Sequence, residues 1–347
     1  MGTTFGLGTF SCDRRPDDDR SHSELYQEML DLSQVAEQNN FDCVWVTEHH
    51  FAPGGYMPSV TSGMAALAAA TDEINIGSNI ALGPQYKQPV RLAEDLAVID
   101  NISEGRLKFG VGNGYRVEEF ENFDVPLDQR ALRLRNLIQI LRKAWSEEEL
   151  SHDAHEALQC GYGCFSFDGA TVTPAPYQED GPPIIVGGFA PPAIKRAGHM
   201  GDGYTIGSLV GLEEAKGAVD IYWDAVEEAG KDPDEQELVV WNFAFLHDEK
   251  DVDDIVEEGW EYTKDQYGEW YHNAGMIENP TDLHAGFDEV SMFYNSTEEM
   301  VEAIEEYQEE FGEDMHFIFQ SMLPGVDYED LKRNIELFGQ EVVPEFT

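Results

Sequence analysis

The strongest constraint on the fold is an alternation of short apolar runs with amphipathic segments of helical length, which continues along the 347 residues of the chain. This alternation is typical of parallel strands joined by crossover helices. Strands are predicted at residues 4–8, 43–47, 74–80, 107–112, 183–187, 203–206, 238–245 and 315–320. Helices are predicted between and after them, at residues 23–39, 59–70, 89–102, 128–145, 191–197, 212–229, 253–271, 297–311 and 328–338.

Eight strands with intervening helices favour a closed barrel over an open doubly wound sheet. The length would suit two average domains, but one barrel with insertions also fills it. We therefore expect an α/β protein, a single (β/α)8 TIM barrel over residues 1–347. Two stretches depart from the repeat, near 147–178 and 268–296, and long irregular inserts of this kind are often lids or binding loops.

The charge of the chain is strongly acidic, with 69 Asp and Glu residues against 21 Lys and Arg and a net charge of -48. The acids are dispersed along the predicted helices, so they are expected to form solvated faces whose mutual repulsion must be screened. Adaptation to molar salt, where the Debye length falls to about 3 Å, is the favoured interpretation. A cation-binding or nucleic-acid-mimicking surface is the alternative. Binding to nucleic acid is disfavoured because phosphate contacts need a basic surface.

The four cysteines, Cys12, Cys43, Cys160 and Cys164, contain no C-x-x-C pair and are too few for a structural zinc site at their spacing. They are expected to be reduced thiols. The first ten residues lack a basic region followed by a long apolar run, and no apolar stretch approaches the length of a membrane span. The chain is therefore expected to be cytoplasmic, with no membrane partner.

A cluster of proton-active side chains, Glu48, His49 and His50, follows the second predicted strand directly. Reacting groups of a barrel lie where the strands end at the carboxyl face. Because side chains alternate along an extended segment, the two histidines should point to different sides, which argues against a shared metal ion. We expect His49 and Glu48 to be catalytic and no metal to be bound.

Small and amide residues follow three other predicted strands at the same rim. A glycine pair that leads into a helix can bind an anion through free backbone amides and the helix dipole. The alternative is that the glycines only permit tight turns, and the spacing of a dinucleotide-binding loop is absent. Arg116 could assist an anion here. The candidate cofactor-binding residues are Ser78, Asn79, Asn113, Gly114, Tyr115, Gly187, Gly188 and Phe189.

Taken in order, five segments resemble the bacterial luciferase-like family of flavin-dependent oxidoreductases: FDCVWVTEHHF (41–51), QPVRLAED (88–95), IDNISEGRLKFGVG (99–112), PPIIVGG (182–188) and GDG (201–203). The resemblance implies a TIM barrel, usually dimeric, that binds flavin mononucleotide (FMN) or the deazaflavin coenzyme F-420 at its carboxyl face. It places His49 beside the flavin ring and a cis peptide between Asn79 and Ile80. The residues that it places near the phosphate are Asn113, Tyr115, Gly187, Gly188 and Phe189.

The function that this resemblance implies is a monooxygenase that uses reduced FMN and molecular oxygen to oxidise a small organic substrate, as a homodimer. No second nucleotide-binding motif is visible for a nicotinamide, so a separate flavin reductase is the expected partner. Hydride transfer with F-420 is the nearest alternative. Two further hypotheses are a metal-dependent hydrolase using Glu48, His49 and His50 with remote help from His152 and His155, and a catalytically silent flavin-binding protein.

Overall fold

The computed structural model describes residues 2–146, 149–153, 166–207 and 211–346. Parallel strands close into a barrel in the order β1-β2-β3-β5-β8-β9-β10-β12, and β12 pairs with β1. The barrel strands are β1 Thr4–Phe10, β2 Cys43–Val46, β3 Asn75–Ser78, β5 Leu107–Gly112, β8 Ile184–Gly187, β9 Gly203–Gly207, β10 Glu237–Leu246 and β12 Met315–Gln320. The predicted (β/α)8 barrel is confirmed.

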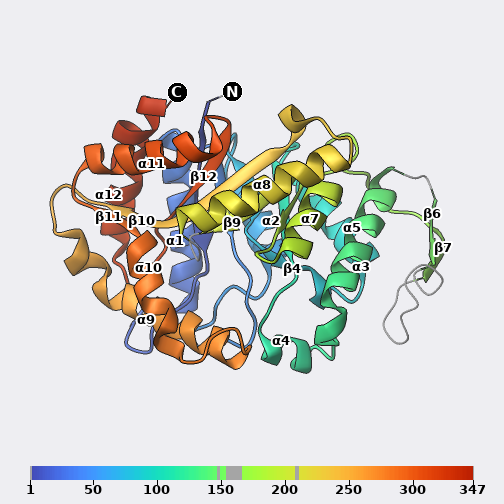
Figure 1. Ribbon diagram of the computed structural model, residues 1–347, viewed down its shortest axis with the longest axis horizontal. Helices are drawn as coiled ribbons and strands as arrows, with labels where there is room; N and C mark the ends of the chain where they lie inside the picture. Colours follow the sequence, from blue (N-terminus) through green and yellow to red (C-terminus); the bar gives the residue numbers. More distant parts are fainter. Residues whose placement is uncertain (1, 147–148, 154–165, 208–210, 347) are drawn as a thin grey trace.

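The helices surround the barrel, with both chain ends near one of its ends and α4 and α9 near the other (Figure 1). The α-helices are α1 His22–Gln38, α2 Val60–Ala70, α3 Pro89–Ile102, α4 Val117–Asn122, α5 Arg130–Ser146, α7 Pro191–Met200, α8 Leu212–Glu228, α9 Val252–Asn273, α10 His284–Val290, α11 Thr297–Phe311 and α12 Tyr328–Leu337. Short helical turns are η1 Gly83–Gln85, η2 Leu127–Gln129, η3 Pro233–Glu235, η4 Pro280–Leu283, η5 Phe338–Val342 and η6 Val343–Phe346. Among the described helices, none has the length and apolar character that a membrane crossing requires.

Helix starts follow from local sequence signals. Ser21 and Glu24 form a capping box at the start of α1, which satisfies backbone amides that have no partner within the helix. Proline occupies the first turn of α3 and of α7, where its missing N–H costs nothing. These signals define where α1, α3 and α7 begin after the preceding strands.

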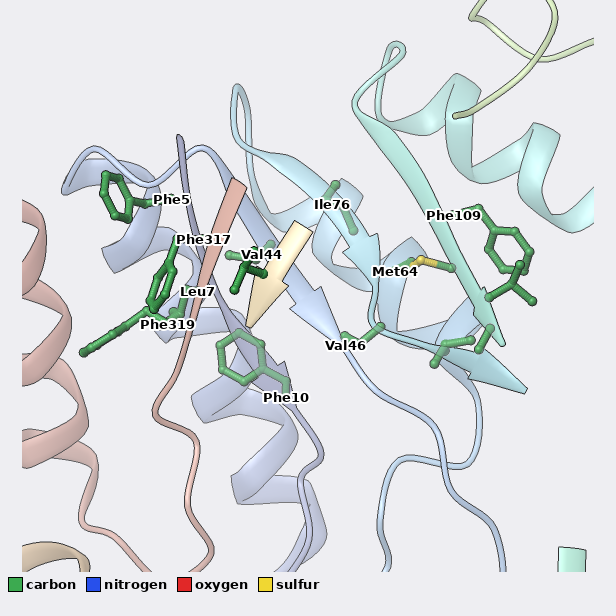
Figure 2. Close-up of a cluster of buried hydrophobic side chains, with 14 of the residues drawn as sticks. Phe5, Leu7, Phe10, Val44, Val46, Met64, Ile76, Phe109, Phe317 and Phe319 are labelled. Atoms are coloured by element: carbon green, nitrogen blue, oxygen red, sulfur yellow. The ribbon is translucent and has the colours of Figure 1, made fainter. Parts of the chain in front are cut away.

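The core has two parts, one between the barrel and its helices and one inside the barrel. Figure 2 shows part of the first, in which Phe5, Leu7, Phe317 and Phe319 lie close to Val44. The second is a small interior cluster composed of Cys43, Trp45, Ile185, Val239 and Ile318. Bulky side chains fill the interior, so the barrel is a packed core and any site must lie at a rim.

The structure differs from the predicted elements mainly near the rims. The third predicted strand ends early as β3, and the chain resumes as β4 Ala81–Leu82 after a cis peptide between Asn79 and Ile80, which the resemblance implied. Helix α4 was not predicted. The segment 268–296 is not irregular, because it holds the end of α9, helix α10 and β11 Met292–Tyr294, which pairs with β10.

The other insert, 147–178, is only partly described. Its strands β6 Leu150–Asp153 and β7 Ser166–Ala170 form an antiparallel pair at the edge of the molecule (Figure 1). Residues 147–148 and 154–165 lie outside the described residues. Much of the insert that was predicted as a possible lid is therefore not described.

Candidate functional site

The imidazole of His49 lies at the carboxyl end of β2, between the loop that holds α4 and the last turns of α9. Its side chain is 8% exposed, and its Nδ1 lies 2.9 Å from Oε1 of Glu119. Its Nε2 makes no hydrogen bond to the described residues. His49 is therefore held through one ring nitrogen while the other is left open for chemistry.

Glu119 is the buried anion of this site. It is fully buried, and burial acts to raise its pKa. The hydrogen bonds from His49 and from the backbone N–H of His50, together with the charge of Arg116, act in the opposite direction, and the net effect lowers the pKa of Glu119. The carboxylate is thus ionised at neutral pH, and its Oε2 has no partner among the described residues.

Aromatic rings enclose His49 on several sides. The ring centroids of Trp270, Tyr56, Tyr115 and Tyr267 lie 4.5, 5.0, 5.8 and 6.3 Å from that of His49. Trp270 and Tyr267 come from α9, Tyr56 from the loop after β2 and Tyr115 from the loop after β5. We call these four residues the aromatic enclosure, and it leaves little room for bulk water around the imidazole.

The tyrosine hydroxyls of this enclosure remain protonated. Burial raises the pKa of Tyr56 and of Tyr115 well above the ordinary value, and it raises that of Tyr267 to about 12. The hydroxyls of Tyr56 and Tyr267 lie 3.0 Å apart, whereas that of Tyr115 is buried without a hydrogen-bond partner among the described residues. The walls around His49 are therefore uncharged, apart from Glu119.

Glu48 and His50 face other surroundings, as expected from their alternation with His49. The two oxygens of Glu48 accept hydrogen bonds from the backbone N–H of Leu82 at 2.6 Å and from the hydroxyl of Tyr86 at 3.0 Å. Nε2 of His50 lies 3.4 Å from Oε1 of Glu48. A cavity of about 180 Å³ adjoins this pair and is lined by Glu48, His50, Pro58, Ser59, Thr61, Gln85, Tyr86 and Phe123.

The predicted cofactor residues of the third strand cross-link the barrel mouth. The hydroxyl of Ser78 donates to the carbonyl of Gly110 at 2.8 Å, and Oδ1 of Asn79 accepts from the hydroxyl of Thr205 on β9 at 2.9 Å. These bonds join β3 to β5 and to β9 at the rim. Both side chains therefore hold the mouth of the barrel together.

The next side chain, Ile80, fills the space above two glycines. A Cβ at Gly112 would lie 2.2 Å from Cδ1 of Ile80, and one at Gly187 would lie 2.8 Å from it. These glycines make room for Ile80, a role that no local sequence pattern indicates.

The residues predicted to approach a phosphate lie in two loops. In the loop after β5, Gly114 has a φ of +68° and Oδ1 of Asn113 is buried without a partner among the described residues. In the loop after β8, a Cβ at Gly188 would lie 2.6 Å from Cβ of Ala193 on α7. Phe189 is 43% exposed.

Arg116 does not provide a free cation for a phosphate. Its side chain is 4% exposed, and its Nη1 donates to the carbonyl of His50 at 2.6 Å and to Oε1 of Glu119 at 3.2 Å. Its Nη2 donates to Glu118 at 3.0 Å. The guanidinium also stacks on Trp270, 4.2 Å from the ring centroid. These contacts occupy both terminal nitrogens of Arg116, so the geometry does not support the expectation that Arg116 assists in binding an anion.

A flavin fits these residues. The unpartnered amide oxygen of Asn113 and hydroxyl of Tyr115 are buried polar atoms of the kind that a bound ligand satisfies. Helix α7 begins with Pro191 and Pro192, which have no N–H, so the backbone amides for an anionic group would be those of the preceding Gly188 and Phe189. Within the described residues there is no group of three or more His, Cys, Asp or Glu side chains that could hold a metal ion. His152 lies on β6, and His155 lies outside the described residues.

The thiols that the structure describes, Cys12 and Cys43, are free, as predicted. Cys160 and Cys164 lie outside the described residues. Burial raises the pKa of the Cys43 thiol well above its ordinary value, so this thiol is not a nucleophile at neutral pH.

Sequence reasoning missed Glu119 and the aromatic residues of α9. Glu119 lies 70 residues from His49 in the chain, and no local pattern joins the two. The aromatic residues did carry a signal, because Tyr267, Trp270 and Tyr271 recur at the spacing of one helix face. That spacing predicts a helix but does not indicate what its aromatic face contacts.

Together, the closed parallel barrel and a proton-active group at its carboxyl rim define an α/β-barrel enzyme. The sequence profile described as luciferase-like monooxygenase matches residues 6–314. The chain belongs to this family of flavin-dependent enzymes.

The chain is similar to individual relatives at 24–28% sequence identity, over 54–99% of its length. The oxygenase component of flavin-dependent trigonelline monooxygenase from Acinetobacter baylyi is 24% identical over 96% of this chain and 93% of its own length. F420-dependent glucose-6-phosphate dehydrogenase from Nocardia farcinica is 28% identical over 54% of this chain and 55% of its own. The solved structure of monooxygenase RslO1 from Streptomyces bottropensis superposes with a TM-score of 0.80 at 24% identity, covering 99% of both chains. The relatives thus include users of both flavin and F-420.

Proposed function

We propose that the chain is the oxygenase component of a two-component monooxygenase, which uses reduced FMN from a separate reductase and molecular oxygen to oxidise a small organic substrate. The observation that carries this proposal is the aromatic enclosure of the His49–Glu119 pair at the barrel rim. Reduced flavin that reacts with oxygen must be protected from water until the substrate is oxidised, and such an enclosure excludes water. The trigonelline monooxygenase relative, an oxygenase component, supports the assignment.

The residues that would hold FMN lie at the ends of three strands. Asn113, Tyr115 and the backbone of Gly187 and Gly188 would hold the phosphate end, while the Ser78–Ile80 segment would support the ring. When bound, reduced FMN supplies two electrons and the reaction with oxygen. Phe189 is exposed at the same rim and would cover part of the bound group.

His49 would move the proton of the reaction through Nε2, because Nδ1 is occupied by Glu119. The aromatic enclosure would keep water from the reacting atoms. Glu48 would act indirectly, because both of its oxygens are engaged by Leu82 and Tyr86. We propose that Glu48 holds the β4 segment in place, and not that it transfers protons.

We also propose a homodimer and a separate reductase as partners. On α3, Val98 and Ile102 are 44% and 46% exposed and lie on one face of the helix. In the proposed dimer the second copy would cover this apolar pair.

Hydride transfer with coenzyme F-420 is the second candidate function. It is favoured by the 28% identity to F420-dependent glucose-6-phosphate dehydrogenase from Nocardia farcinica. In that case His49 would take or give the proton of an alcohol or a carbonyl, and oxygen would not be consumed.

Anaerobic titration of the purified protein with reduced FMN and, separately, with reduced F-420 tests the proposal. We expect reduced FMN to bind in a 1:1 ratio, followed by oxygen uptake when air is admitted. Binding of reduced F-420 alone, without oxygen uptake, would refute the monooxygenase and favour hydride transfer.

A further inference from the structure

We infer that Glu119 is a positioning residue that fixes His49 as the Nδ1–H tautomer and so presents Nε2 to the reaction. This inference deepens the proposed function, because it rests on His49 as the acid/base of that reaction. It assigns a task to a residue that lies on the short helix α4, outside the strand-end motif that contains His49.

The geometry around Glu119 determines which nitrogen of His49 carries the hydrogen. Oε1 of Glu119 accepts from three donors: Nδ1 of His49 at 2.9 Å, the backbone N–H of His50 at 2.9 Å and Nη1 of Arg116 at 3.2 Å. An ionised carboxylate can only accept hydrogen bonds. Nδ1 must therefore carry the hydrogen, and Nε2 of the neutral ring carries the lone pair.

The charge of Glu119 is stabilised by its partners. A fully buried carboxyl group would ordinarily be driven toward its neutral form. Here burial raises the pKa of Glu119, but hydrogen bonds from His49 and His50 and the charge of Arg116 outweigh it and lower the pKa overall. The carboxylate therefore remains an acceptor as the pH falls toward mildly acidic values.

Glu119 is itself held in place by Arg116. This guanidinium binds the same carboxylate and the carbonyl of His50, and it stacks on Trp270 at 4.2 Å. One carboxylate oxygen thus joins the His49 ring, the backbone of the His50 loop and, through Arg116, the Trp270 ring of α9. A side chain that served only to fill space would not need hydrogen bonds from His49, His50 and Arg116 to one of its oxygens.

The test uses variants at two adjacent glutamates. Glu119→Ala removes the acceptor, and Glu119→Asp keeps the charge beside Arg116 but shortens the reach to His49. Glu118→Ala is the matched control, because Glu118 is 54% exposed and also binds Arg116 but does not contact His49. The tautomer of His49 is read by ¹⁵N NMR of histidine-labelled protein in high salt, without cofactor, at a pH where the ring is neutral. A His49→Asn variant assigns the signal.

We expect a single Nδ1–H tautomer in the parent protein and in Glu118→Ala. In Glu119→Ala and Glu119→Asp we expect a mixture of both tautomers. Turnover with reduced flavin should fall about 10- to 100-fold in kcat, by analogy with the loss of a carboxylate that orients a metal-binding histidine. KM for the flavin should change by much less than kcat.

An unchanged Nδ1–H tautomer in either Glu119 variant would overturn the inference. Glu119→Asp keeps the test decisive if the alanine variant fails to fold. Because the NMR measurement needs no cofactor, its outcome does not depend on whether the chain uses FMN or F-420. Failure of the proposed function and failure of this inference are therefore distinguishable.

Discussion

An imidazole with one nitrogen bound to a buried carboxylate has a single nitrogen left for proton transfer. At His49 this partner is Glu119, although Glu48 is its neighbour in the chain. Glu48 faces the other way, toward Leu82 and Tyr86. Glu48 and His49 therefore have different partners although they are neighbours in the chain, because successive side chains of an extended segment point to opposite sides.

Replacing His49 by Ala should abolish flavin-dependent oxygenation while leaving flavin bound. Removal of a general acid/base costs about 10²- to 10⁴-fold in rate, whereas the residues proposed to hold the phosphate are untouched. Single-turnover oxidation and the dissociation constant for reduced FMN provide the two measurements. The exposed His199 on α7 supplies the control variant His199→Ala, which should behave as the parent. Unchanged turnover in His49→Ala would remove His49 from the mechanism.

At the scale of the element, α9 is the main cover of the site. Its residues Tyr267 and Trp270 contact His49, and Tyr271 packs on Tyr115 with ring centroids 4.7 Å apart. All three lie on one face of the helix. The end of α9, which includes Trp270, falls within the predicted insert 268–296. Because Trp270 covers His49, we propose that this part of the insert is the lid.

Replacing Trp270 by Ala should open this cover. We expect a larger share of the consumed oxygen to appear as hydrogen peroxide, because water would reach the reacting flavin. Loss of a buried tryptophan should also lower the free energy of unfolding by about 3–5 kcal/mol. Peroxide yield per oxygen consumed and a denaturant titration measure the two effects separately.

The control for this experiment is Trp223→Ala, which removes a half-buried indole from α8. It should destabilise the protein without raising the peroxide yield. Equal peroxide yields in the two variants would mean that Trp270 acts through stability alone.

At the scale of the whole molecule, the large negative net charge is the main factor that makes the stability of the folded state depend on salt. With 69 acidic and 21 basic residues, most carboxylates cannot have a cationic partner. Ion pairs such as Arg20–Asp18 and Lys108–Glu237 use part of the small basic complement. The remaining repulsion opposes the compact state unless salt screens it.

We therefore predict that the midpoint of thermal unfolding rises with KCl concentration. The Debye length falls from about 10 Å at 0.1 M to about 3 Å at 1 M, so most of the gain should occur in this interval. Circular dichroism across a KCl series measures it. A neutral osmolyte at equal osmolality is the control, because it is excluded from the protein surface but does not screen charges. A flat or falling midpoint in KCl would contradict salt adaptation.

The barrel and the position of His49 could be predicted from the sequence because both depend on local patterns. Strand and helix periods are read within a few residues, and the carboxyl ends of parallel strands must share one rim. The eight predicted barrel strands agree with the structure for this reason. The cis peptide between Asn79 and Ile80 also agrees, but it was expected from the family resemblance and not from a local pattern.

Only the tertiary structure decided what surrounds His49. Glu119 reaches it from α4, Tyr56 from the loop after β2 and Trp270 from α9, and their approach depends on how these segments pack over the rim. The packing also explains why Gly112 and Gly187 lack a side chain, since Ile80 fills the space beside them. It directs Arg116 toward Glu119 and away from solvent. Periodicity determines which face of each element is apolar, but contacts between side chains distant in the chain are fixed only when the whole barrel closes.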